Sequence, residues 1–136
     1  MKKCYLDANC LIYFVSDSSS EHTNGIAVIQ SIYEKHLIPV ISPLCLDEFL
    51  YHVKGDIKQK KHDLSSILAL PKLQIVNPPI EFRQQTKILE YMKKFGLHPR
   101  DAYHLLTAIY NKVKYFATFD HDFDAVFAAK KLRQFV

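Results

Sequence analysis

Residues 37–50 read LIPVISPLCLDEFL, and the change of pattern inside this stretch decides the fold. Leu37–Ile41 is a short and almost wholly apolar run, which is typical of a strand that is buried on both faces. Ser42 then supplies a helix N-cap, and Pro43 suits the first helical position. Because apolar residues repeat at helical spacing from there to about Gly55, the stretch predicts a buried strand that leads directly into a helix.

The same alternation of strand and helix patterns extends along the chain. Strands that alternate with helices indicate right-handed crossovers and a parallel sheet with helices on both faces, so we expect one α/β domain over residues 1–136. The stretch Ser16–Asn24 is polar and predicts a loop. The other predicted strands are Lys3–Leu6, Leu73–Val76 and Lys114–Thr118, and the other predicted helices are Gly25–His36, Asp56–Leu70, Ile80–Phe95, a helix from Pro99, and a turn and short helix over Asp120–Ala129.

Composition restricts the class of protein. The chain has 136 residues, of which 49% are hydrophobic, and this is enough to fill the core of one domain. Its 3 cysteines are an odd number and include no Cys-x-x-Cys pair, which favours reduced thiols in a cytoplasmic protein. Asp7 and Asn9 interrupt the apolar start of the chain, so we expect neither a signal peptide nor a membrane span. The net charge of +4 suits a polyanionic partner.

Carboxylates follow predicted strands or lie in the helices beside them, at Asp7, Glu48, Asp101 and Asp120. In a parallel α/β sheet, ligands bind beyond the carboxyl ends of the strands, so we expect these acids to meet there. Two carboxylates about 4 Å apart repel by about 4 kcal/mol at an effective dielectric constant of about 20. The cluster therefore predicts a site for Mg²⁺ or Mn²⁺, since these cations prefer oxygen ligands.

Some of these polar residues also have a purely structural explanation. Asp7 or Asn9 could cap the next helix, and Asp122 could cap the last one. Asp101 could stabilise the first turn of its helix through the helix dipole. If the strand continues past Asp7, however, the i, i+2 spacing makes Asp7 and Asn9 face the same side, so both would point into the crevice.

Other common sites are excluded by spacing. The histidines His98, His104 and His121 form no His-x-x-x-His or His-Glu-x-x-His motif, so oxygen ligands dominate and favour a hard divalent cation over zinc. With only 3 glycines, the chain has no glycine-rich phosphate loop, and no Gly-x-Ser-x-Gly elbow occurs.

Motifs around the four acids occur in a fixed order: YLDAN (5–9), SPLCLDEF (42–49), PRDAYHL (99–105) and ATFDHDF (117–123). In this order they resemble the motifs of the PIN-domain nucleases, a family that includes the toxin ribonucleases of VapBC-type toxin-antitoxin pairs. The resemblance covers nearly the whole chain and implies a PIN-like three-layer α/β/α sandwich around a central parallel sheet. It further implies that Asp7, Glu48, Asp101 and Asp120 occupy the family's acidic positions, that Asn9 and Thr118 are supporting polar residues, and that Asp122 could share the role of Asp120.

These observations together predict a metal-dependent endoribonuclease. One or two Mg²⁺ or Mn²⁺ ions held by the acids would lower the pKa of a water molecule and bind the scissile phosphate. The alternative is a non-catalytic module that binds RNA or protein and uses its acids as helix caps. The resemblance also implies an antitoxin partner. A homodimer is predicted from apolar residues near polar loops, namely Tyr13, Phe14, Tyr51, Ile57 and Leu64.

Overall fold

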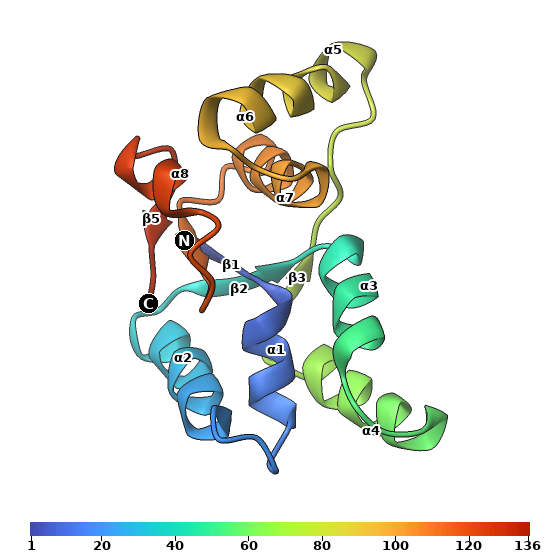
Figure 1. Cartoon of the computed structure of the whole chain (residues 1–136). Helices are drawn as coiled ribbons and strands as arrows, with labels where there is room; N and C mark the ends of the chain where they lie inside the picture. The colour runs from blue at the N-terminus through green and yellow to red at the C-terminus, as the bar shows by residue number, and fades with distance from the viewer.

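The computed structural model describes residues 1–136, and its centre is a parallel sheet of 5 strands in the order β3-β2-β1-β4-β5 (Figure 1). The first strand, β1, lies in the middle and pairs with β2 and β4 on its two sides. This arrangement confirms the prediction of a central parallel sheet. The strands are β1 (Lys3–Leu6), β2 (Ile38–Ile41), β3 (Gln74–Ile75), β4 (Tyr115–Ala117) and β5 (Arg133–Gln134).

Helices cover both faces of the sheet, so the layers are α/β/α as expected (Figure 1). In the view of Figure 1, α1 and α2 lie below the sheet with α3 and α4 beside α1, whereas α6 and α7 lie above it. No helix is both long enough and apolar enough to span a membrane. The helices are α1 (Ala8–Val15), α2 (His22–Glu34), α3 (Pro43–His52), α4 (Ile57–Leu68), α5 (Phe82–Gln85), α6 (Lys87–Phe95), α7 (Pro99–Tyr110) and α8 (Asp124–Ala128).

Local capping chemistry sets where several helices begin and end. Ser42 caps α3 by accepting the N–H of Cys45, and Pro43 is the first helical residue, as the sequence predicts. Asp56 caps α4 in the same way. Gly96 ends α6 in the left-handed conformation, at φ 66°. The start of α3 matters for function, because it fixes the position of this helix at the carboxyl end of β2.

The core lies on both faces of β1. Tyr5 and Phe116 from neighbouring strands are fully buried and stack with their ring centroids 5.2 Å apart. On the α1 side, the helices approach closely at Gly25 of α2, where an added Cβ would lie 2.5 Å from the backbone carbon of Tyr13. Any side chain at residue 25 would therefore force α1 and α2 apart.

Four elements differ from the sequence prediction. The segment 8–15 is a helix that was not predicted, and α2 begins at His22 instead of Gly25. The predicted helix over Ile80–Phe95 is two helices, α5 and α6, with Thr86 between them. The strand β5 was also not predicted. Asp122 does not cap α8, whose N-cap is Phe123.

Residues proposed for a dimer contact differ in their exposure. Tyr51 and Ile57 are 79% and 82% exposed, so they are free to meet a partner. Phe14 and Leu64 pack against the core, and Tyr13 lies against Phe119 with ring centroids 5.3 Å apart, so these three are less available for a dimer contact. The homodimer itself stays a prediction.

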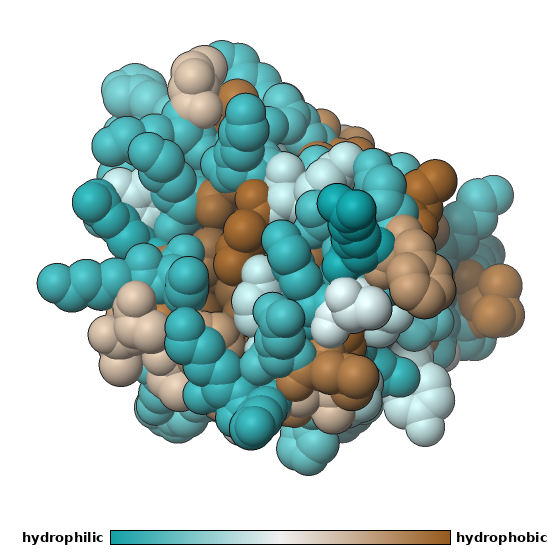
Figure 2. Space-filling model, turned by 90° about the horizontal axis from the view of Figure 1, so that it is seen from above, coloured by the Kyte–Doolittle hydropathy of each residue, from teal (hydrophilic) through white to brown (hydrophobic).

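The face above α5 and α6 is mainly polar. Figure 2 views the molecule from above and shows a largely hydrophilic surface with separate hydrophobic patches. Ile80, Phe82 and Leu89 are the large hydrophobic residues most exposed in this part of the chain. They are scattered among charged residues, as is common on protein surfaces.

Candidate active site

Asp7 directly follows β1 at the carboxyl end of the sheet and is the N-cap of α1. Its backbone N–H donates to the carbonyl of Ala117, the last residue of β4, at 2.9 Å. Its Oδ1 accepts the N–H of Ala8 at 2.8 Å, so the predicted capping role is confirmed. The cap also holds the carboxylate in one orientation, with Oδ2 left for other contacts.

Two polar residues hold the second oxygen of this carboxylate. Thr118, the residue after β4, donates from Oγ1 to Asp7 Oδ2 at 2.7 Å. Asn9 Nδ2 lies 3.4 Å from the same oxygen and 3.3 Å from Thr118 Oγ1. The expectation that Asn9 continues the strand is wrong, because it lies in the first turn of α1. In this helical position the side-chain amide of Asn9 still contacts Asp7, so Asn9 and Thr118 both hold the carboxylate of Asp7 in place.

Glu48 reaches the same edge from the second turn of α3. Its Oε1 forms a hydrogen-bonded ion pair with His104 Nε2 on α7. The side chain of His104 is 1% exposed and that of Glu48 is 16% exposed. Since one ligand atom each from Asp7, Glu48 and His104 lie within 4.8 Å of one another, these groups form a compact cluster at the carboxyl end of the sheet.

A buried hydrogen-bond network fixes His104 from the other side. Its Nδ1 lies 2.7 Å from the hydroxyl of Tyr5 in β1, and this hydroxyl lies 2.6 Å from Oγ of Ser42. Ser42 is also the cap of α3, the helix that carries Glu48. The network therefore ties β1, α3 and α7 together directly behind the carboxylates.

His104 is a cation in this environment. Burial disfavours the charged imidazolium, but the hydrogen bonds from His104 to Cys45 and Glu48 outweigh burial and raise the pKa of His104 to about 10. Both ring nitrogens then carry a proton at neutral pH, so Nδ1–H donates to Tyr5 and Nε2–H donates to Glu48. The positive charge of His104 offsets part of the negative charge of the nearby acids.

Asp101 lies in the first turn of α7, one turn before His104. Burial and, after it, the charges of Asp122 and Asp7 together raise the pKa of the Asp101 carboxyl to about 6, although the charge of His104 opposes the rise. Burial likewise raises the pKa of Asp7, against the charge of His104 and the hydrogen bond from Thr118. The acids are therefore close enough to disfavour one another's ionisation.

Asp120 and Asp122 lie differently in the loop after β4. Both are exposed, and the backbone N–H of Asp120 donates to Thr118 Oγ1 at 3.1 Å. Among the neighbouring charges, Asp122 raises the pKa of Asp101 most. Burial and, after it, the charges of Asp7, Cys4 and Asp120 raise the pKa of the Cys10 thiol in α1. The loop thus brings Asp122 toward α7 and Asp120 toward α1.

The donors in this cluster fit a hard divalent cation. Both nitrogens of His104 are occupied by Tyr5 and Glu48, so His104 is poorly placed to be a metal ligand. The available donors are carboxylate oxygens, which Mg²⁺ and Mn²⁺ prefer over nitrogen or sulfur.

The role of His104 is not predicted from the sequence. The histidines lack a zinc-binding spacing, and this spacing is the only signal for which they were assessed. A signal was nonetheless present, because residues three apart on a helix lie on the same face, and His104 follows Asp101 by three. The position of the acid therefore also indicated the position of the histidine.

The raised pKa of Asp101 gives a testable pH dependence in the metal-free protein. An acid whose pKa is higher in the folded state destabilises the fold when it is ionised, and this cost disappears as the pH falls through 6 toward the ordinary value of 3.8. Asp101→Asn should therefore raise the free energy of unfolding at neutral pH, by less than about 1 kcal/mol because the group is partly solvated. Urea titrations in chelator at neutral pH and at about pH 4 measure the difference. An equal gain at both pH values would contradict the assignment.

The sequence model of the PIN domain family matches residues 4–128. The comparison with curated proteins found no match.

Solved structures of similar fold include three bacterial proteins or complexes. The Mycobacterium tuberculosis toxin VapC20, described as cleaving the sarcin-ricin loop, has a TM-score of 0.66 at 11% identity over 91% of this chain and 95% of its own. VapBC2 from Rickettsia felis, bound to a DNA fragment from its promoter, has a TM-score of 0.68 at 18% identity over 96% of both chains. FitAcB from Neisseria gonorrhoeae has a TM-score of 0.62 at 21% identity over 98% of this chain and 96% of its own. At these identities the similarity shows the fold.

Proposed function

We propose that this chain, which belongs to the PIN domain family, is a metal-dependent endoribonuclease. The observation that carries the proposal is the compact cluster of Asp7, Glu48 and His104 at the carboxyl end of the sheet. Asp101 lies near this cluster, since burial and the charges of Asp122, Asp7 and Glu48 raise its pKa to about 6. Acids held this close are costly to a fold that uses them only as caps. The same crowding is useful in a protein that binds a divalent cation.

Each predicted site residue has a role in this proposal. Asp7, Glu48 and Asp101 would hold Mg²⁺ or Mn²⁺, with Asp120 completing the set and Asp122 able to share its role. When bound, the cation supplies Lewis acidity that lowers the pKa of water and neutralises charge on the phosphate. Asn9 and Thr118 hold the carboxylate of Asp7 in place through the hydrogen bonds described above.

Cleavage of RNA is the direct test. The purified chain should cut single-stranded RNA in Mg²⁺ or Mn²⁺, should be inactive in chelator, and should recover when the cation is restored. An RNA-binding or protein-binding module without catalysis is the alternative. Binding of RNA with no cleavage in either cation would favour that module.

A thermal shift tests the metal site without relying on activity. Because a cation binds only where folding has gathered the acids, millimolar Mg²⁺ or Mn²⁺ should raise the melting temperature by several degrees at saturation. Asp101→Asn should reduce this shift, whereas Asp47→Asn, at the exposed neighbour of Glu48, should leave it unchanged. If neither cation shifts the melting temperature, the metal assignment is wrong.

We also infer that the protein is the toxin of a toxin-antitoxin pair. The inference is supported by the family and by the fold shared with the VapBC and FitAcB structures. An antitoxin would inhibit most simply by covering the acids with an arginine or lysine, so excess Mn²⁺ should weaken its inhibition. A cytoplasmic location is in line with an RNA substrate and with the free, buried Cys4, Cys10 and Cys45.

A further inference from the structure

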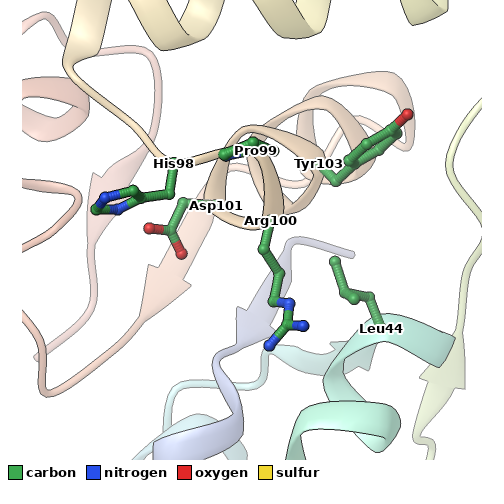
Figure 3. Close-up of a pocket in the computed structure, with 6 residues that line it drawn as sticks. All are labelled: Leu44, His98, Pro99, Arg100, Asp101 and Tyr103. Carbon is green, nitrogen blue, oxygen red and sulfur yellow. The ribbon is translucent and has the colours of Figure 1, made fainter.

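A pocket lies beside the acids and shares one of them. Its volume is about 610 Å³, and it lies between the start of α7 and the start of α3. Figure 3 shows Arg100 reaching down from α7 and Leu44 reaching up from α3 into the same space, with Asp101 at the neighbouring position on the helix. The pocket is lined by Leu44, His98, Pro99, Arg100, Asp101 and Tyr103.

Arg100 is an unpaired cation next to a group of acids. The ion pairs in the structure are His104 with Glu48 and His121 with Asp124, so Arg100 belongs to neither. Its side chain is exposed, which leaves its planar set of five N–H donors free for a ligand. The guanidinium geometry matches the two oxygens of a phosphodiester, which a lysine ammonium contacts only as a point charge.

The rest of the pocket suits the apolar parts of a nucleotide. Leu44, Pro99 and Tyr103 supply apolar or aromatic surface to its lining. The hydroxyl of Tyr103 donates to Gln85 in α5 at 2.9 Å, so its ring is held in one orientation. Ordered aromatic rings beside a cation are a common way to bind single-stranded RNA.

We propose that this pocket binds the nucleotide next to the cleavage site, with Arg100 on a phosphate and Leu44 and Tyr103 against the base or sugar. The inference rests on the proposed function for the identity of the ligand, because the neighbouring acids would cut the RNA that the pocket holds. A segment of protein would also fit an apolar pocket. RNA is favoured because the free guanidinium suits a phosphodiester and because Asp101, which lines this pocket, is also close enough to Asp7 and Glu48 to be affected by their charges.

Binding and its salt dependence test the proposal independently of cleavage. A short fluorescent single-stranded RNA is titrated in chelator into Asp7→Asn protein, whose cleavage should be too slow to degrade it during the measurement, at several salt concentrations. Adding Arg100→Gln should weaken binding about tenfold and lower the slope of log affinity against log salt by about 0.7, since one phosphate contact is lost. Arg100→Lys should keep the slope and recover part of the affinity.

Arg133→Gln provides the matched control. Arg133 is exposed and lies in β5, paired with the first residue of β4 and therefore toward the amino end of the strands. The Arg133→Gln variant removes the same charge at a distance from the pocket. The RNA affinity and its salt slope should therefore change less than in Arg100→Gln. Equal effects of both variants, or no effect of Arg100→Gln, would overturn the proposal, and so would a loss of antitoxin binding with RNA binding intact.

The experiments distinguish a wrong pocket assignment from a wrong nuclease assignment. If wild-type protein cuts RNA and Arg100→Gln has the same KM, the nuclease stands and the pocket assignment is wrong. If wild-type protein does not cut RNA but Arg100→Gln lowers the affinity and the salt slope, the pocket stands and the nuclease is wrong.

Discussion

Asp7→Asn and Asp101→Asn should each lower the rate of RNA cleavage by about 10²–10³-fold while the fold survives. Both changes remove a negative charge without changing the shape of the side chain. Asparagine is as good an N-cap as aspartate, so Asp7→Asn should keep the start of α1. The measurement is the single-turnover rate in Mn²⁺, with circular dichroism on the same samples.

Asp47→Asn is the control for this pair of variants. Asp47 is exposed on α3 next to Glu48, so the variant changes the net charge equally outside the cluster. It should cleave RNA at the wild-type rate. If Asp7→Asn and Asp101→Asn retain that rate as well, these acids are not the catalytic residues.

His104→Leu is expected to have the largest combined effect on stability and activity. It leaves the carboxylate of Glu48 without its buried partner, which should cost about 2–3 kcal/mol of unfolding free energy. Cleavage should fall by about 10–100-fold, because Glu48 is no longer held toward Asp7, and half-saturation of the thermal shift should need more Mn²⁺.

His104→Gln separates positioning from packing. Its amide can still donate to Glu48, so it should recover part of the activity and of the Mn²⁺ affinity that His104→Leu loses. The pKa of His104 is raised from 6.5 to about 10, so the stability that the charged histidine adds is complete below about pH 6.5 and is lost as the pH rises through 10. The difference in stability between wild type and His104→Gln should therefore shrink over that range, whereas His62→Leu on the exposed face of α4 should show no such trend. Identical losses in His104→Leu and His104→Gln would argue for packing alone.

The parts of the fold that were predicted correctly have strong local signals. Ser42 and Pro43 form a typical helix start. The buried strands are short apolar runs with helices between them. The segment 10–15 was missed because it is apolar at every position, and periodicity cannot distinguish a buried helix from a strand there. The strand β5 was missed because only Arg133 and Gln134 form it, at the sheet edge, where pairing with β4 decides the structure.

In the site, too, the features that depend on local sequence are predicted and those that depend on distant residues are not. Positions of Asp7, Glu48 and Asp101 relative to the strand ends follow from element boundaries, which the sequence indicates. The link from His104 to Glu48 joins residues 56 positions apart, and nothing local predicts it. The orientations of Asp120 and Asp122 depend on the path of an exposed loop, so spacing alone does not distinguish their roles.

The order of the strands has a consequence for when activity can arise during synthesis. Because β1 lies between β2 and β4, the carboxylate of Asp7 is held by Thr118, 111 residues later in the chain. Contacts of such long range form slowly and only once both partners are available. A growing chain that ends before β4 has Asp7 and Glu48 but not Thr118 or Asp120, so the proposed nuclease remains inactive toward nearby RNA until the later strand has joined the sheet.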